Sequence, residues 1–105
     1  MTISIMTANL NGIRAAQRKG FFDWLAGERP DVLCIQETKA QRDQLDDGPY
    51  FPDGYTSAFA DAEKKGYSGV ALYSLREPDK ISRGIGIEAI DREGRWLEAQ
   101  FGNLS

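Results

Sequence analysis

The stretch Asp31-Val-Leu-Cys-Ile-Gln-Glu37 decides the fold of this chain. Its four consecutive apolar residues, Val32 to Ile35, are typical of a strand that is covered on both faces. Pro30 stands just before the run, and since the residue before a proline avoids the helical region, any upstream helix must end there. The run therefore predicts a buried strand inside a sheet, with the carboxylate of Glu37 directly after it.

A further strand and a helix precede this run. Residues 3–9 alternate apolar and polar side chains imperfectly and lead into the turn signal Asn11-Gly12, which predicts a strand. Apolar residues at spacings of three and four predict one amphipathic helix over residues 13–28, with a weak point at Gly20. Strand, helix and strand in this order predict two parallel strands whose carboxyl ends open on the same edge of a sheet.

Short β-rich segments dominate the remainder of the chain. Three of them are predicted strands: residues 55–60, 70–74 and 97–101. The polar residues 41–54 predict a surface loop with one helical turn. Trp24 and Trp96 are expected to pack within the fold. The whole pattern predicts a mixed α/β fold, with residues 1–105 as one small domain or part of a larger one.

The composition is that of an ordinary folded protein, with 41% hydrophobic and 28% charged residues. Thirteen Lys and Arg against sixteen Asp and Glu give a net charge of −3, so any contact with nucleic acid must be local. The chain has no histidine and one cysteine, which excludes histidine-based triads, zinc sites and an internal disulfide. No signal peptide or membrane-spanning apolar run is evident. We therefore expect a cytoplasmic protein without a membrane partner.

Polar clusters follow both of the predicted parallel strands: Asn9-Leu-Asn11-Gly12 and Gln36-Glu37-Thr38-Lys39. Ligand sites of open α/β sheets form at this edge. A carboxylate that emerges from a buried strand needs a donor, a cation or a metal, and a carboxylate with amide oxygens suits Mg²⁺ or Mn²⁺. The alternative is that the two amides only build the turn, while the carboxylate of Glu37 pairs with Lys39 or Arg14.

Four motifs stand in order along the chain: Thr7-Ala-Asn-Leu-Asn-Gly-Ile-Arg-Ala15, Arg29-Pro-Asp-Val-Leu-Cys-Ile-Gln-Glu-Thr-Lys39, Gly66-Tyr-Ser-Gly-Val70, and Gly84-Ile-Gly86 with Asp91-Arg-Glu-Gly-Arg95. Together they resemble the exodeoxyribonuclease III family of apurinic/apyrimidinic (AP) endonucleases. The similarity runs over essentially the whole chain, and four ordered motifs are more specific than any one of them. The resemblance implies that residues 1–105 are the N-terminal portion of a four-layered αβ sandwich of the endonuclease/exonuclease/phosphatase type.

The activity implied by this resemblance is that of a DNA-repair nuclease. Such enzymes hydrolyse phosphodiesters of double-stranded DNA 5′ to abasic sites and at 3′ ends, with Mg²⁺ or Mn²⁺ as cofactor. Carried over residue by residue, Glu37 is a metal ligand, and Asn9 and Asn11 belong to the same site. Contacts with DNA phosphates, through backbone or side-chain groups, are implied for Arg14, Lys39, Gly66, Tyr67 and Ser68. The intact protein is expected to be a monomer.

The water-activating groups of the family are not matched in this chain. The resemblance implies a catalytic Tyr, Asp, Asn and His in segments beyond Ser105, and the chain itself has no histidine. We therefore expect residues 1–105 to be part of one domain that is inactive and poorly stable alone. Two alternatives stay open. One is a metal-dependent phosphatase or phosphodiesterase of the same superfamily that acts on another substrate, and the other is a non-catalytic DNA-binding remnant.

Overall fold

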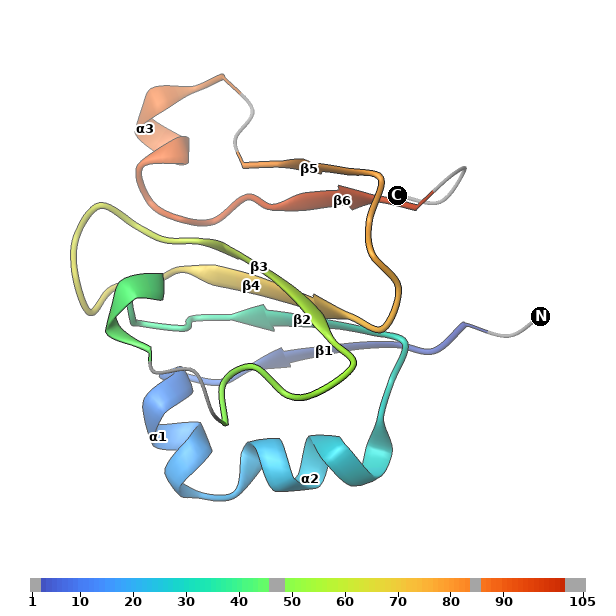
Figure 1. Cartoon of the computed structure of the whole chain (residues 1–105). Helices are drawn as coiled ribbons and strands as arrows, with labels where there is room; N and C mark the ends of the chain where they lie inside the picture. The colour runs from blue at the N-terminus through green and yellow to red at the C-terminus, as the bar shows by residue number, and fades with distance from the viewer. Residues whose placement is uncertain (1–2, 46–48, 84–85, 102–105) are drawn as a thin grey trace.

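The computed structural model describes residues 3–45, 49–83 and 86–101, and its centre is a four-stranded sheet (Figure 1). The order of its strands is β1-β2-β4-β3, with the bounds β1 Ile5–Asn9, β2 Val32–Gln36, β3 Thr56–Ala60 and β4 Val70–Ser74. β1 and β2 are parallel, and β4 runs antiparallel to both of its neighbours. The predicted parallel pair is confirmed, and β2 lies inside the sheet as its apolar run indicates.

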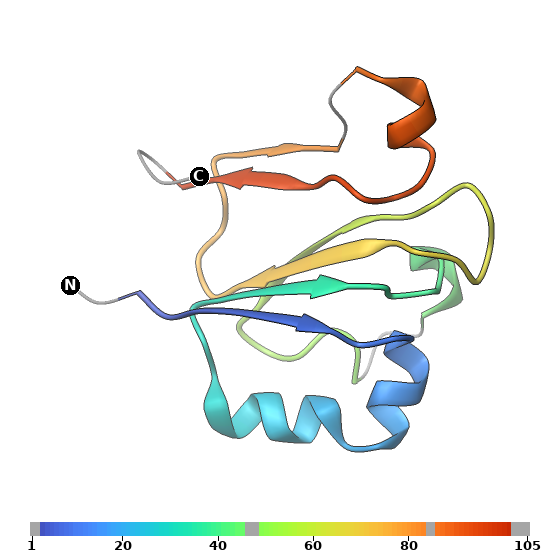
Figure 2. The ribbon, with the colours of Figure 1, turned by 180° about the vertical axis from the view of Figure 1, so that it is seen from behind.

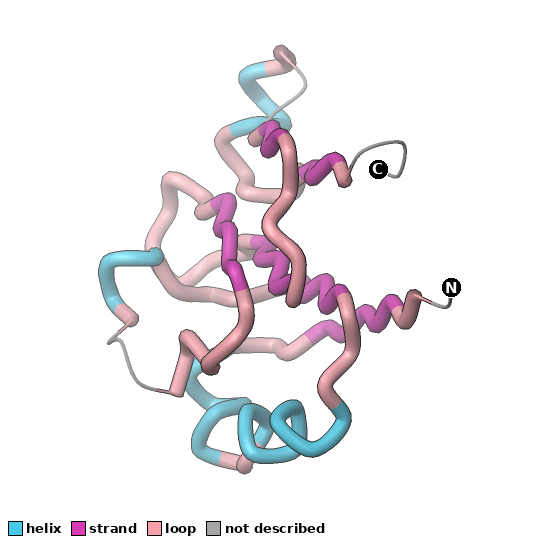
Figure 3. Tube along the Cα trace, turned by 45° about the vertical axis from the view of Figure 1, so that its right-hand side comes forward, coloured by secondary structure: helices cyan, strands magenta, loops and turns pink. Residues whose placement is uncertain are grey.

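A small second sheet and two helices cover opposite faces of this sheet. β5 (Lys80–Ser82) pairs antiparallel with β6 (Glu98–Gln100). Figures 1 and 2 show this pair over one face, while α1 (Ile13–Arg18) and α2 (Phe21–Glu28) run along the other. Figure 3 shows the same layers from a third side. The mixed α/β class predicted from the sequence is confirmed.

Two short elements complete the described structure. The 3₁₀ turn η1 (Arg42–Gln44) is the single helical turn predicted in the loop after β2, and α3 (Glu88–Asp91) lies between β5 and β6. Residues 46–48 of that predicted loop and Gly84 of the fourth motif lie outside the described residues. In the part of the chain that is described, no helix is both long and apolar enough to span a membrane.

The predicted single helix over residues 13–28 is wrong, because the helical segment is broken at Gly20. α1 ends at Arg18, and Gly20 follows with a φ of 92°, a left-handed conformation that glycine adopts without steric cost. The carbonyl of Gly20 then accepts the N–H of Trp24 at 3.1 Å, which opens α2. The glycine that sequence analysis treats as a weak point within one helix is the turn between two.

The core lies between the two helices and the facing side of the four-stranded sheet. Both helices and three of the strands contribute buried side chains to this core: Ile13, Phe22, Leu25, Leu33, Ile35, Phe59 and Tyr73. Tyr73 has no exposed surface, and its hydroxyl donates to the carbonyl of Tyr50 at 2.8 Å. Because this polar tip has a partner, the ring is buried without leaving an unsatisfied donor.

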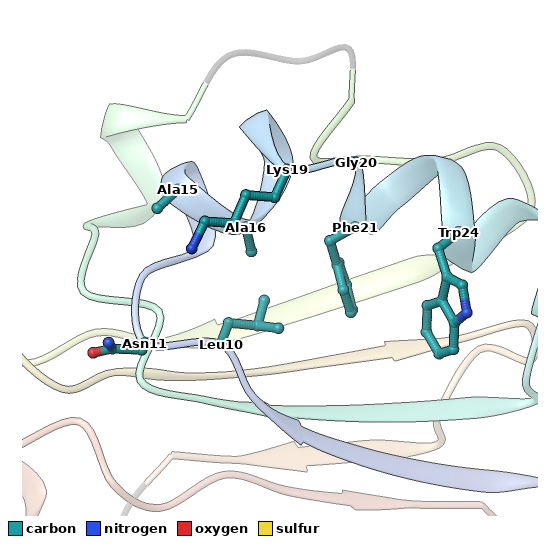
Figure 4. A pocket seen from close by; sticks show the side chains of 8 residues that line it. All are labelled: Leu10, Asn11, Ala15, Ala16, Lys19, Gly20, Phe21 and Trp24. Carbon is teal, nitrogen blue, oxygen red and sulfur yellow. The ribbon is translucent and has the colours of Figure 1, made fainter.

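The two tryptophans do not pack as predicted. Trp24 is 47% exposed and Trp96 is 41% exposed. Figure 4 shows Trp24 beside Phe21 on the wall of a hollow of about 350 Å³ along the two helices, with the ring centroids 5.8 Å apart. The prediction for Trp24 fails because the residues that α2 buries against the core are Phe22 and Leu25.

Cys34 lies half-buried on β2, beside a hollow of about 210 Å³ that is also lined by residues of β6. Burial raises the pKa of its thiol above the ordinary value of 9.0. Only the thiolate reacts with alkylating reagents. We therefore expect iodoacetamide at pH 8 to modify Cys34 several-fold more slowly in the native chain than in urea, measured by mass spectrometry. Equal rates in the two conditions would contradict the burial of this thiol.

Candidate functional site

The structure brings the two predicted polar clusters together at the carboxyl ends of β1 and β2. The side-chain amide of Asn9 donates to Oε2 of Glu37. Oδ1 of Asn9 accepts the backbone N–H of Asn11 at 3.0 Å, which closes a turn directly after β1. The backbone N–H of Gly12 donates to the carbonyl of Glu37 at 2.8 Å. Hydrogen bonds therefore connect the segment that follows β1 to the segment that follows β2, beyond the end of the parallel pairing.

Lys39 completes the contacts of the carboxylate. Its Nζ lies 3.7 Å from Oε1 of Glu37 and donates to Oδ1 of Asn11. The side chains of Glu37 and Lys39 are each 40% exposed, so the pair adds little to stability. It does fix the direction of the carboxylate. The turn-building amides and the lysine pairing, considered above as an alternative to a metal site, both occur here and surround the carboxylate with donors.

The backbone around Glu37 holds several unfavourable conformations. Positive φ angles occur at Asn11 (49°), Glu37 (55°), Lys39 (51°) and Ser68 (49°). Non-glycine residues rarely adopt this left-handed region, which costs on the order of 1–3 kcal/mol for each residue. Among the described residues, Arg29 is the further non-glycine case. Strain gathered around one carboxylate is the pattern found where function dictates geometry.

The loop before β4 braces the turn that carries Glu37. The carbonyl of Ser68 accepts the N–H of Lys39 at 2.7 Å, and the carbonyl of Gly69 accepts the N–H of Thr38 at 3.1 Å. Thr38 is 1% exposed, and its hydroxyl lies against Gly69 so closely that a Cβ there would collide with it. These contacts lock the two loops together and hold the strained turn in place.

A basic hollow of about 350 Å³ opens beside this turn. Its lining residues are Gly12, Arg14, Ala15, Arg18, Thr38, Lys39 and Gly66. Arg14 Nη2 donates to the carbonyl of Lys39 at 3.5 Å, which ties α1 to the turn. Three of the predicted phosphate-binding residues, Arg14, Lys39 and Gly66, therefore lie around one space. Positive charge in such a hollow attracts phosphate groups.

Arg18 is a functional candidate that sequence analysis missed. It lies four residues after Arg14 on α1, and residues at this spacing share one face of a helix. That spacing is the signal in the sequence, because it places two cations on one face of a helix beside a polar loop. Arg18 therefore joins Arg14 among the residues that line the basic hollow.

Tyr67 and Ser68 lie in different surroundings from Gly66. Ser68 is 7% exposed and contributes its carbonyl to the bracing of Lys39. The hydroxyl of Tyr67 donates to Oε1 of Glu93 at 3.0 Å and accepts from Nη2 of Arg95 at 2.8 Å. The phosphate-binding roles of these two residues stay predictions.

The donor set at this edge fits a cation such as Mg²⁺. Glu37 supplies one carboxylate, which the Asn9 amide nitrogen contacts, while the amide oxygens of Asn9 and Asn11 accept from the Asn11 N–H and from Nζ of Lys39 and would turn to a bound cation. Mg²⁺ in proteins is commonly held by one or two carboxylates, with water and substrate phosphates completing its octahedral shell. Across residues 3–45, 49–83 and 86–101, no three side chains of His, Cys, Asp or Glu gather in one place.

The two stacked sheets with helices on the outer face define an α/β sandwich that carries a carboxylate and a basic hollow at one sheet edge. The model of the Endonuclease/Exonuclease/phosphatase family matches residues 6–104, and the chain belongs to this family. Within it, the similar proteins are exodeoxyribonucleases and AP endonucleases.

Two curated relatives and one solved structure define this similarity. The exodeoxyribonuclease of Bacillus subtilis (strain 168) is 41% identical over 103 residues, which make up 97% of this chain and 40% of that protein. The DNA repair nuclease APEX1 of Danio rerio is 40% identical over 103 residues, 94% of this chain and 33% of that protein. An AP endonuclease structure from Archaeoglobus fulgidus has a TM-score of 0.79 at 34% identity, covering 96% of this chain and 38% of its own. The chain therefore spans 40% or less of the length of each.

Proposed function

We propose that the protein containing this chain is a DNA-repair nuclease that hydrolyses phosphodiesters 5′ to abasic sites and at 3′ ends, with Mg²⁺ or Mn²⁺ as cofactor. The observation that carries this proposal is the position of Glu37. Its carboxylate contacts Asn9 and Lys39 at the sheet edge, next to a hollow lined by Arg14 and Arg18. A cation site adjoining a phosphate site suits cleavage of a phosphodiester.

Each residue of the site has a part in this proposal. Glu37 would hold the cation, with Asn9 and Asn11 beside it, and a bound cation would supply polarisation of the scissile phosphate and charge stabilisation of the departing oxygen. Lys39 orients the carboxylate and adds positive charge near the phosphate. Arg14 holds phosphates of the duplex, with Arg18 from the same helix. Phosphate contacts set position on DNA without reading bases, which suits recognition of a site whose base is missing.

Activation of the attacking water requires groups outside these 105 residues. A histidine base cannot come from this chain, which has none. We propose that a Tyr, an Asp, an Asn and a His from elsewhere in the protein fulfil this role, so that residues 1–105 carry the metal-binding and phosphate-binding part of the site. The partner is double-stranded DNA with an abasic site or a 3′ end, and the enzyme is proposed to act as a cytoplasmic monomer.

The basic hollow is tested by removing its arginines. We expect Arg14→Ala and Arg18→Ala each to weaken binding of the chain to a duplex with an abasic-site analogue by about three- to tenfold, measured by fluorescence anisotropy at low salt. Each variant should also reduce the slope of log K against log salt by about 1, because each arginine neutralises one phosphate.

Arg76→Ala is the matched control for this measurement. Arg76 is exposed and follows β4 at its carboxyl end, at the opposite edge of the sheet from the site. Its removal changes the net charge by the same amount and should leave the affinity nearly unchanged. Equal losses in all three variants would mean that general charge, and not the hollow, attracts DNA. Tight binding of inositol phosphates in place of the duplex would favour a phosphatase of the same family.

A further inference from the structure

Two loops that are distant in the sequence dock on each other beside the basic hollow. Figures 1 and 2 show the loop between β3 and β4 next to the segment that leads from α3 into β6. The N–H of Glu63 donates to the carbonyl of Arg92 at 2.9 Å. Gly94 is buried at a φ of 61°, so close to the backbone of residues 60–62 that a Cβ would collide with it. The two loops are therefore held together at the level of the backbone.

Tyr67 joins these loops through its side chain. Its hydroxyl donates to Oε1 of Glu93 at 3.0 Å and accepts from Nη2 of Arg95 at 2.8 Å. Glu93 and Arg95 also pair with each other at 3.9 Å. A phenol has a single proton to donate. While Glu93 accepts that proton, the hydroxyl cannot donate it to a phosphate of DNA.

The ring of Tyr67 contacts two cationic side chains. Nζ of Lys64 and Cζ of Arg95 each lie 5.5 Å from the ring centroid, within the range of a cation–π contact. Gly66, the residue before it, lines the basic hollow. Tyr67, with two cations against its ring, therefore directly follows a residue that lines the hollow.

We propose that Glu93 and Arg95 are positioning residues for DNA binding that act through Tyr67. They fix its hydroxyl, so that the ring and the adjoining backbone meet the strand in one orientation. This inference rests on the proposed function, since it needs DNA as the ligand. Holding a side chain in its binding orientation beforehand removes part of the entropy cost of association. The loss of either partner weakens binding and leaves the metal-binding carboxylate of Glu37 untouched.

A double-mutant cycle tests whether Glu93 acts through Tyr67. The dissociation constant of the chain for the abasic-analogue duplex is measured for the wild type, Tyr67→Phe, Glu93→Gln and the double variant, each first shown to be folded by circular dichroism. We expect each single variant to weaken binding by about three- to tenfold, and the double variant to bind no more weakly than the weaker single one. Multiplying losses would overturn the proposal.

The sign of the Glu93 effect separates positioning from charge. Glu93→Gln removes a negative charge, which by electrostatics alone strengthens binding to DNA. A weaker complex therefore cannot arise from the charge change, and a tighter one would contradict the proposal. Glu88→Gln is the control, because this substitution removes the same charge. Glu88 lies on the exposed surface, where it pairs with Arg92 at 3.8 Å. Arg95→Lys, which keeps a cationic donor, should retain more affinity than Arg95→Met.

A spectroscopic readout that needs no DNA completes the test. The chain has four tyrosines, so tyrosine labelled with carbon-13 at Cζ gives four NMR signals, and Tyr67→Phe identifies the one from Tyr67. Glu93→Gln should move this signal alone. If it does not move, or if the cycle is additive while the wild type binds the duplex, the positioning role is wrong and the proposed function stands. If neither the wild-type chain nor a chimera in which it replaces the matching part of the Bacillus subtilis exodeoxyribonuclease binds any duplex, the proposed function fails and this inference fails with it.

Discussion

We expect Glu37→Gln to abolish the proposed metal-dependent cleavage of abasic DNA, because the amide keeps the shape of the side chain and removes the charge proposed to hold the cation. We expect kcat to fall by at least about 100-fold. The measurement uses a chimera in which residues 1–105 replace the matching part of the Bacillus subtilis exodeoxyribonuclease, which shares 41% identity over 103 residues. The same substitution in the chain alone should eliminate Mn²⁺ binding detected by electron paramagnetic resonance.

Glu28→Gln is the matched control for this experiment. Glu28 is exposed at the end of α2, away from the residues that contact Glu37. The Glu28→Gln substitution removes the same charge and should leave both cleavage and Mn²⁺ binding unchanged. Retention of cleavage by Glu37→Gln would show that the carboxylate serves the turn and the pairing with Lys39 rather than a cation. Loss of both signals in the control as well would mean that general charge, and not one site, attracts the metal.

The position of this carboxylate was predictable from local sequence alone. Four apolar residues followed by Glu37 predict a buried strand that ends in a charge, and β2 confirms the strand. The parallel partner follows from the order of strand, helix and strand, which places Asn9 at the same sheet edge. Both predictions depend only on residues that are close in the sequence. Burial of apolar residues predicts the strand, and the crossover connection predicts its parallel partner.

Contacts between distant segments were not predictable in the same way. Tyr67 meets Glu93 and Arg95 across 26 and 28 residues, and no periodic pattern connects the two loops. The left-handed turns are equally hidden, because Glu37 and Lys39 carry ordinary side chains that give no sign of a positive φ. Tertiary bracing imposes these conformations, so they emerge only when the loop before β4 is in place.

This bracing links the stability of the core to the geometry of the site. The strained turn around Glu37 is held by carbonyls of Ser68 and Gly69, directly before β4. β4 in turn lies between β2 and β3, and Tyr73 anchors it in the core. Tyr73 lies in the core and has no proposed contact with DNA or metal, yet its packing determines whether the turn around Glu37 keeps its conformation. Damage to the packing of β4 should appear first as lost stability and then as lost binding.

Tyr73→Ala should destabilise the chain by about 3–5 kcal/mol, the usual cost of removing a large buried aromatic side chain. Its ring lies in the centre of an aromatic cluster, with centroids 6.0 Å from those of Phe22 and Phe59. Because small domains are stable by only about 5–15 kcal/mol, this loss leaves little margin. Urea unfolding followed by tryptophan fluorescence measures it, and a cost below about 1 kcal/mol would contradict the central position of Tyr73.

Tyr73→Phe separates the ring from the hydroxyl. It keeps the packing and removes the bond to the carbonyl of Tyr50, which should cost about 1 kcal/mol. Burial also raises the pKa of Tyr73 above its ordinary value of 10.0. A group whose pKa is raised on folding stabilises the protein below the unfolded pKa, and this contribution is lost as pH rises toward the folded value. The wild type should therefore lose stability above about pH 10, and Tyr73→Phe should lose less over the same range. Parallel pH curves for the two proteins would show that the buried phenol does not ionise on unfolding.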